Sequence, residues 1–231
     1  MIRFACLPLS VDLPSIQHEV TQLTTEWMPH LNTKYYTGNW DIKSLRSPRG
    51  AEDNSVPDLM SAGDTYLDTP LMARCPAIQE FTGNLQCNIM SVRLMNLRSG
   101  AVIKPHRDYD LCFEKGEARI HVPVFTNDQV TFYCEEQLVP MREGECWYIN
   151  ANKTHQVANR GTSDRIHLVI DCVVNDWMKD LFGRAEKNEV PDILDVQETM
   201  ALIAALKTHH TEMANTMAAS LQAQLEAQAT A

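Results

Sequence analysis

Residues 87–172 alternate between short β-rich runs and turn-forming residues, and this alternation constrains the fold more than any other feature of the sequence. Pairs such as Ser99-Gly100 and Glu143-Gly144 separate the runs. Closely spaced short strands of this kind are typical of an all-β sandwich or barrel. We therefore predict a mainly β fold with a double-stranded β-helix core, a jelly roll, which can hold a ligand between its sheets. The expected strands are Ile89–Leu97, Ala101–Pro105, Ala118–Phe125, Val130–Tyr133, Glu145–Asn150, Gln156–Asn159 and Arg165–Cys172.

The residues before this core mix helical and loop signals. After Pro14, apolar side chains recur at spacings of three and four, which predicts an amphipathic helix that ends before Pro29. Its apolar residues are Ile16, Val20, Leu23 and Trp27. Residues 44–76 are dense in Pro, Gly, Asp, Asn and Ser, which is typical of a long loop. Such a loop either covers a site or simply connects two elements.

From Pro191 onward the sequence predicts one or two helices, with Asp192 as the N-cap. Apolar residues follow the helical period through Val196, Met200, Ile203, Leu206, Met213 and Met217. Such a stripe packs on its own domain or on a second subunit more often than on a cofactor, so a homo-oligomer formed through this helix is possible. We expect residues 1–180 to form a jelly-roll domain, with its core at 87–173, and residues 181–231 to form a C-terminal helical extension.

Charge, hydropathy and cysteine content limit the kinds of partner and the cellular compartment that we expect. The formal charge of −10 opposes the cation-driven binding of nucleic acid, so no nucleic-acid partner is expected. No apolar run approaches the roughly 20 residues that span a bilayer, and no membrane association is expected. The seven cysteines are scattered without a CxxC pair, and the N-terminus lacks a signal-peptide pattern. These features indicate reduced thiols and a cytoplasmic protein.

One short motif suggests a metal centre. His106 and Asp108 lie two residues apart after an apolar strand, so an extended backbone directs both side chains to one face. His155 follows a later strand. Two histidines and one carboxylate form the facial triad of non-haem Fe(II) oxygenases, which leaves three octahedral positions open. The other reading is chance, because a chain with eight histidines produces a His-x-Asp easily. We interpret His18, His30, His209 and His210 as ordinary core or surface residues.

Basic residues on two of the expected strands strengthen the interpretation. Arg165 begins an apolar strand and shares a face with His167 and Asp171. A guanidinium binds carboxylate in a bidentate manner, which suits a dicarboxylate whose keto-acid end chelates the metal. Arg119 and His121 repeat the arrangement on a second strand. An exposed strand charge explains Arg119 equally well.

The stretch from Arg93 to Asp171 resembles the aspartyl/asparaginyl β-hydroxylase family of Fe(II)/2-oxoglutarate-dependent dioxygenases, and is close to its bacterial branch of free-proline hydroxylases. The order and spacing of several short blocks agree with this family. These blocks are Ile103-Lys104-Pro105-His106-Arg107-Asp108-Tyr109, Arg119-Ile120-His121, Gly144-Glu145-Cys146-Trp147-Tyr148-Ile149-Asn150, His155, and Arg165-Ile166-His167-Leu168-Val169-Ile170-Asp171.

The resemblance implies a role for each matching position. Fe(II) would be bound by His106, Asp108 and His155, and Arg165 would hold the distal carboxylate of 2-oxoglutarate, assisted by Arg119 and His121. The weaker candidates for contacts with the substrate are Arg93, Arg107 and Trp147. Trp147 could instead be a core residue, and Arg93 could instead form an ordinary salt bridge. Asp171 could orient one of the ligating imidazoles through a hydrogen bond.

The implied activity is hydroxylation of an amino-acid side chain at the expense of dioxygen and 2-oxoglutarate, which is decarboxylated to succinate. A free amino acid is favoured over a peptide, because Arg93 and Arg107 supply cations for a substrate carboxylate. Three alternatives stay open at this point. They are a peptidyl aspartyl/asparaginyl β-hydroxylase, a non-catalytic cupin-like module that binds a metal or small acid, and a zinc or manganese hydrolase or isomerase on the same fold.

Overall fold

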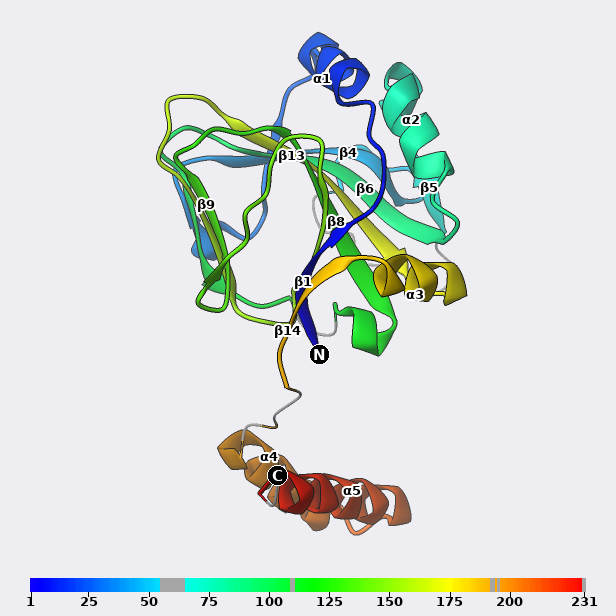
Figure 1. The fold of residues 1–231 in the computed structure, drawn as a ribbon, viewed down its shortest axis with the longest axis vertical. Coiled ribbons are helices and arrows are strands. Elements are labelled where there is room, and N and C mark those ends of the chain that lie inside the picture. The colour runs from blue at the N-terminus through cyan, green and yellow to red at the C-terminus, as the bar shows by residue number, and fades with distance from the viewer. Residues whose placement is uncertain (55–64, 109–110, 192–193, 195, 230–231) are drawn as a thin grey trace. The chain divides into compact units, whose positions relative to one another are not determined.

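The computed structural model of the protein describes residues 1–54, 65–108, 111–191, 194 and 196–229. Tyr109 of the family motif and the expected N-cap Asp192 lie outside these residues. The chain forms two compact units, one of residues 2–189 and one of residues 190–231 together with Met1. The larger unit holds the strands, and the smaller one holds the last two helices (Figure 1).

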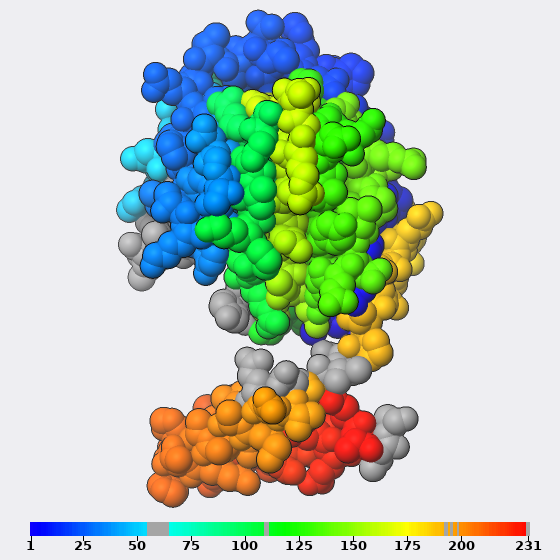
Figure 2. Space-filling model, turned by 90° about the vertical axis from the view of Figure 1, so that its left-hand side faces the viewer, coloured from blue at the N-terminus to red at the C-terminus, as the bar shows by residue number. Residues whose placement is uncertain are grey.

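The larger unit is built from two antiparallel sheets. The nine-stranded sheet has the order β14-β1-β11-β8-β13-β6-β4-β2, with β5 paired to β4, and the five-stranded sheet has the order β10-β9-β12-β7-β3. Figure 2 views the outer surface of the smaller sheet, where β3 (blue), β7 (teal), β12 (yellow-green) and β9 (green) lie side by side. The mainly β, jelly-roll fold is confirmed, and all seven expected strands are present. The strands are β1 (Ile2–Leu7), β2 (Met28–Pro29), β3 (Tyr36–Thr37), β4 (Trp40–Pro48), β5 (Tyr66–Asp68), β6 (Asn88–Leu97), β7 (Val102–His106), β8 (Glu117–Phe125), β9 (Val130–Cys134), β10 (Gln137–Leu138), β11 (Cys146–Ile149), β12 (His155–Asn159), β13 (Arg165–Val173) and β14 (Glu186–Glu189).

The side chains of β13 alternate between two apolar clusters, one on each face of the large sheet. Leu168 and Ile170 belong to the cluster that lies between the large sheet and the helices. Val169 belongs to the cluster between the two sheets. Because side chains alternate along a strand, Arg165, His167 and Asp171 share the face of Val169, which is the face of the ligand-sized space between the sheets.

Three α-helices of the larger unit pack on the outer face of the large sheet, and three short 3₁₀ segments occur in its connections. Helix α1 begins after Asp12, whose carboxylate accepts a hydrogen bond from the Ser15 amide. It ends at Gln22 rather than at the expected Trp27: the backbone becomes extended at Leu23, and buried Lys43 donates a hydrogen bond to the Thr25 carbonyl beyond the helix end. The elements are α1 (Leu13–Gln22), α2 (Pro76–Gly83), α3 (Asp176–Gly183), η1 (Thr33–Tyr35), η2 (Met72–Arg74) and η3 (Phe113–Lys115).

Part of the region expected to be a loop is strand. Residues 44–48 continue β4, and residues 66–68 form β5. The polar residues that suggested a loop are buried within the sheet, with Ser44 and Ser47 each 2% exposed. The Ser47 hydroxyl donates to the Ala51 carbonyl at 2.6 Å. Because these buried hydroxyls form hydrogen bonds inside the fold, a strand that contains them has the composition of a loop, and composition alone does not predict it.

The smaller unit is a helical hairpin of α4 (Val196–Thr208) and α5 (Glu212–Ala229). The continuous apolar stripe breaks where His210 adopts a φ of +50°, so the chain forms two antiparallel helices. Gln228 donates to the Leu194 carbonyl at 3.0 Å and accepts from the Leu194 amide at 2.6 Å, which closes the open end of the hairpin. None of the helices that the structure describes is both long and apolar enough to cross a membrane.

Candidate metal centre

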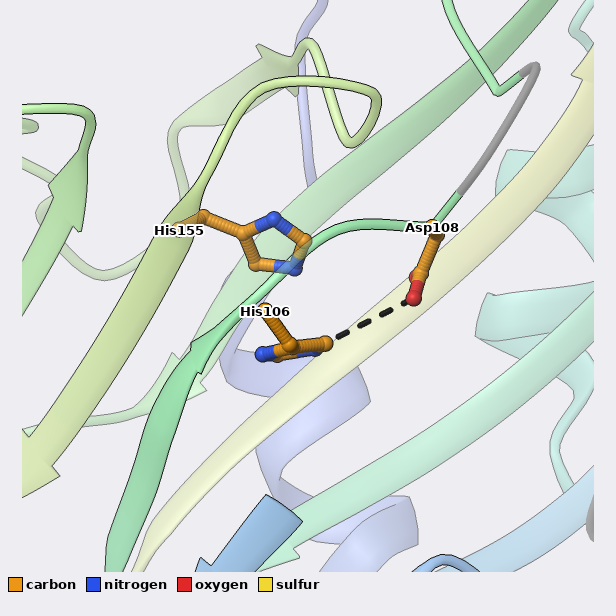
Figure 3. A group of neighbouring side chains, drawn as sticks. All are labelled: His106, Asp108 and His155. Atoms are coloured by element: carbon orange, nitrogen blue, oxygen red, sulfur yellow. Dashed lines mark ion pairs between the residues drawn. The ribbon is translucent and has the colours of Figure 1, made fainter.

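His106, Asp108 and His155 converge in the structure (Figure 3). One ligand atom from each residue lies within 4.8 Å of the others. His106 Nε2 is 3.9 Å from Asp108 Oδ1, and the two imidazole centroids are 4.2 Å apart. These separations suit three donors around one ion, because ligands about 2 Å from a metal lie roughly 3–4 Å from one another.

The strand pairing brings the three side chains together. His106 ends β7 and His155 begins β12, and the two residues face each other in the antiparallel register. The Asp108 amide donates to the Ala151 carbonyl at 2.9 Å, which fixes the loop that carries the carboxylate. The metal-ligand motif is thus a consequence of strand register and a single loop hydrogen bond.

Backbone carbonyls orient both imidazoles. His106 Nδ1 lies 2.8 Å from the Lys104 carbonyl, and His155 Nδ1 lies 3.0 Å from the Lys153 carbonyl. A carbonyl only accepts, so each Nδ1 carries the proton and each Nε2 keeps its lone pair for a metal. Burial, with the neighbouring imidazole, lowers the pKa of His155 to about 4, so this ring is neutral at physiological pH.

A buried ionic network lies behind the carboxylate. Arg119 bridges two acids, since its Nη1 donates to Asp108 and its Nε donates to Asp171 at 2.6 Å. Asp171 also accepts from Arg93 at 2.6 Å and from Ser91 at 2.8 Å. Burial opposes the charge of Asp108, but Arg119 and the two imidazoles hold the pKa of this carboxyl below its usual range. Arg119 therefore keeps Asp108 ionised and fixes its orientation.

Arg165 differs from the other two arginines. It is 2% exposed, and no carboxylate among the described residues lies within ion-pair distance. Its Nη2 lies 2.8 Å from His167 Nδ1, and its Nε has no hydrogen-bond partner in the part of the chain that the structure describes. Burial lowers the pKa of Arg165 to about 9, so the guanidinium stays protonated at neutral pH. A buried cation without a counter-ion is costly, and its charge would be balanced by an anion bound in the pocket.

The pocket that contains these groups is also lined by residues that the sequence motifs do not predict. His30, Asn32, Tyr35 and Trp40 line it together with Arg93, Arg119, His121 and Arg165. His30 stacks on Trp40 with ring centroids 3.8 Å apart, and burial lowers the pKa of His30 to about 4. Nothing in a single sequence links residues 30–40 to the metal motif, so the place of His30 in the pocket, where it is not an ordinary surface residue, emerges only from the structure. The Tyr35 ring stacks on the imidazole of His106, with ring centroids 5.1 Å apart, and so covers one face of this candidate metal ligand.

Three expected residues lie elsewhere. Trp147 is in the core between the sheets, where it packs near Phe4 and donates to Glu145 at 2.8 Å. Arg107 donates to the Thr154 hydroxyl at 2.9 Å, and neither Trp147 nor Arg107 is among the described residues that line the pocket. Asp171 does not orient an imidazole, because its oxygens accept from Ser91 and the arginines while backbone carbonyls hold both Nδ1 atoms.

The fold and this site define a class, a jelly-roll protein with a candidate two-His-one-carboxylate centre beside a buried anion site. Comparison with known proteins identifies the family. The sequence model described as aspartyl/asparaginyl beta-hydroxylase matches residues 11–174, and the chain belongs to this family.

Individual relatives are more distant. The chain is 26% identical over 172 residues to L-proline cis-4-hydroxylase of Rhizobium meliloti (strain 1021), a match that covers 74% of this chain and 58% of that relative. Similar solved structures include a 2OG-Fe(II) oxygenase family oxidoreductase from Burkholderia pseudomallei, with 12% identity, a TM-score of 0.45 and coverage of 70% of this chain and 78% of that one. A viral collagen prolyl hydroxylase from Paramecium bursaria Chlorella virus-1 has 9% identity, a TM-score of 0.43 and coverage of 74% and 97%.

Proposed function

We propose that the protein is an Fe(II)/2-oxoglutarate-dependent dioxygenase that hydroxylates the side chain of a free amino acid. The observation that carries this proposal is the pairing of a converged His106, Asp108 and His155 with a buried Arg165 that has no carboxylate partner among the described residues. A protein that only held a metal would have no use for the second feature.

The donor set fits a ferrous ion. His106 and His155 would bind through Nε2, and Asp108 would bind through the carboxylate that Arg119 holds. Three protein donors on one side leave the remaining positions for a chelating co-substrate and dioxygen. With iron and 2-oxoglutarate bound, such a centre supplies the oxidising power for an unactivated C–H bond, while the protein contributes placement and shielding.

Arg165 fits the distal carboxylate of 2-oxoglutarate. Within the described ranges, neither its Nε nor the buried Nδ1 of His121 has a hydrogen-bond partner. Both residues line the same pocket as the three candidate ligands. A bound dicarboxylate would supply acceptors for these two atoms and compensate the buried charge. Arg119, in contrast, already bridges two carboxylates, so we assign it to positioning Asp108 rather than to holding the co-substrate.

The charges around the pocket favour a substrate with a carboxylate group. Arg93, Arg119 and Arg165 carry three positive charges, and Asp108 and Asp171 carry two negative ones. The two positive charges of a ferrous ion balance the two negative charges of 2-oxoglutarate, so the site with both bound keeps one net positive charge. Arg93 lines the same pocket as His30 and Trp40, and it is the cation that we expect nearest to a substrate carboxylate.

A mass-spectrometric screen tests the proposal. The protein is incubated with ferrous iron, ascorbate, 2-oxoglutarate and a panel of free amino acids, and Asp108→Ala serves as the control. We expect one amino acid to gain 16 mass units and succinate to form in equal amount. Hydroxylation of peptides but not of free amino acids would reverse the substrate assignment. An absence of both succinate and product would favour a non-catalytic, cupin-like module.

A further inference from the structure

The C-terminal hairpin exposes an unusual amount of apolar surface. Of nine exposed large apolar side chains in the described residues, five belong to α4 and α5. The two helices contain only four charged residues. Solvent-exposed helices normally carry a charged or polar face, so this surface is atypical of one that remains in water. The five side chains are Val196, Met200, Leu202, Met213 and Met217.

The hairpin also buries very little within itself. Among the hairpin residues whose burial the structure describes, the buried ones are Thr199, Ile203, Ala214 and Ala218, and only one of these is a large apolar side chain. Units of fewer than roughly 40 residues need disulfides, metals or association to be stable, because their own core is too small. The hairpin therefore requires a further apolar surface to pack against.

Helical geometry places three of the exposed residues on one face. Leu202, Met213 and Met217 each directly precede a residue that is buried in the hairpin seam, namely Ile203, Ala214 and Ala218. In antiparallel helices, the positions one residue before the seam lie on the same side of the pair. We call the face formed by Leu202, Met213 and Met217 the methionine face.

We propose that the methionine faces of two copies of this chain pack together and form a four-helix bundle, which makes the protein a homodimer. The 18 residues of α5 extend about 27 Å, and two packed helices are about 20 Å wide. Two hairpins face to face therefore cover about 500 Å² on each copy, or about 1,000 Å² in total, which reaches the lower limit for a specific interface.

Charge supports a second copy in an antiparallel arrangement. Lys207 and Glu212 lie at the turn end of the hairpin, and Glu226 lies near the open end. Antiparallel packing brings Lys207 of one copy toward Glu226 of the other, whereas parallel packing would bring the two Glu226 carboxylates together. A twofold axis also pairs each methionine face with an identical apolar face.

The test compares full-length variants by light scattering coupled to size-exclusion chromatography. We expect the wild-type protein to have twice the chain mass of 26.2 kDa. Met213→Glu/Met217→Glu places two carboxylates in the interface and should weaken the dimer by at least about 100-fold. Asn215→Glu/Ala219→Glu adds the same charge at the same spacing on exposed positions of α5 outside the methionine face, and should remain dimeric.

Two further measurements separate dissociation from general unfolding. Met213→Leu/Met217→Leu keeps the apolar face and should remain dimeric. The far-ultraviolet circular dichroism of Met213→Glu/Met217→Glu should lose helix signal on dilution before the thermal transition of the jelly-roll unit changes. A monomeric wild-type protein would overturn the proposal, as would equal masses for the two glutamate variants. Neither result bears on the oxygenase assignment, since the site residues are unchanged in every variant.

Discussion

Replacing Arg165 with methionine should separate co-substrate binding from fold stability. Arg165→Met keeps an unbranched side chain and removes the charge and all donors. At most positions in a core, such a change would weaken the protein. Here the guanidinium is buried and has no carboxylate partner among the described residues, so its removal eliminates an unfavourable term in the folded apoprotein.

The opposing terms in the apoprotein are similar in size. Removal of the buried charge relieves a desolvation penalty of several kcal/mol. It also loses the 2.8 Å contact with His167 Nδ1, at a cost of about 1–3 kcal/mol, and the cation–π contact with Phe132 at 5.8 Å, at about 0.5–2 kcal/mol. We therefore expect the free energy of unfolding of the apoprotein to change by no more than about 2 kcal/mol in either direction.

The effect on 2-oxoglutarate is much larger. A distal carboxylate bound in the pocket would lose its buried ionic partner, and breaking such a pair costs about 3–5 kcal/mol. At about 1.4 kcal/mol per tenfold change, the dissociation constant should rise about 100- to 1,000-fold or more. Isothermal titration of the manganese-loaded protein with 2-oxoglutarate measures this constant, and urea unfolding of the apoprotein measures stability.

Arg119→Met is the matched control because the chemical change is identical and the surroundings differ. Arg119 bridges Asp108 and Asp171, so its removal leaves both carboxylates short of a cation. The apoprotein should lose about 3–5 kcal/mol of unfolding free energy. If Arg165→Met destabilised the apoprotein as strongly as Arg119→Met, or bound 2-oxoglutarate as tightly as the wild type, the division of roles between these arginines would be refuted.

Three other predictions follow from the site. Asp108→Ala should weaken Co(II) binding, followed by its visible absorption, by more than about 100-fold, because a ligand contributes more than the 10- to 100-fold of the groups behind it. Burial opposes ionisation of Asp171, but Arg119 and Arg93 hold the pKa of this carboxyl well below its usual range. Its stabilising contribution is therefore complete above about pH 5 and is lost progressively as the pH falls below that value, so urea unfolding should show a steeper decline from pH 5 to pH 3 for the wild type than for Asp171→Asn. Tyr35→Ala removes an exposed ring from the pocket rim and should raise the KM for the amino acid about 3- to 10-fold without lowering the melting temperature.

The strands of the core could be predicted because each is a short β-rich run bounded by turn residues. The sequence also predicted the convergence of His106 and Asp108, since two residues at i and i+2 near a strand share a face whatever the tertiary structure. Arg165 could be proposed as the residue that holds a carboxylate for the same reason. The alternation of side chains along its apolar strand places Arg165 on the face opposite to Ile166, Leu168 and Ile170.

Other features depend on contacts between distant segments. Strand β4 carries buried polar residues whose partners lie within the fold, so its composition resembled that of a loop. His30 and Trp40 reach the pocket only because β4 joins the large sheet beside β6. Periodicity cannot show that Arg119 is compensated by two carboxylates while Arg165 has none among the residues that the structure describes. That distinction decides which arginine can bind an anion.

The uncompensated charge of Arg165 is a form of preorganisation. The desolvation penalty is incurred when the protein folds, so an arriving carboxylate does not need to strip water from the cation. A keto acid that lacks the second carboxylate, such as 2-oxopentanoate, would chelate a metal but leave Arg165 uncompensated. We expect it to bind the wild type about as weakly as 2-oxoglutarate binds Arg165→Met. The two losses should not add, so Arg165→Met should bind both keto acids with similar affinity. If the variant still preferred 2-oxoglutarate as strongly as the wild type does, the distal carboxylate would lie against a different residue.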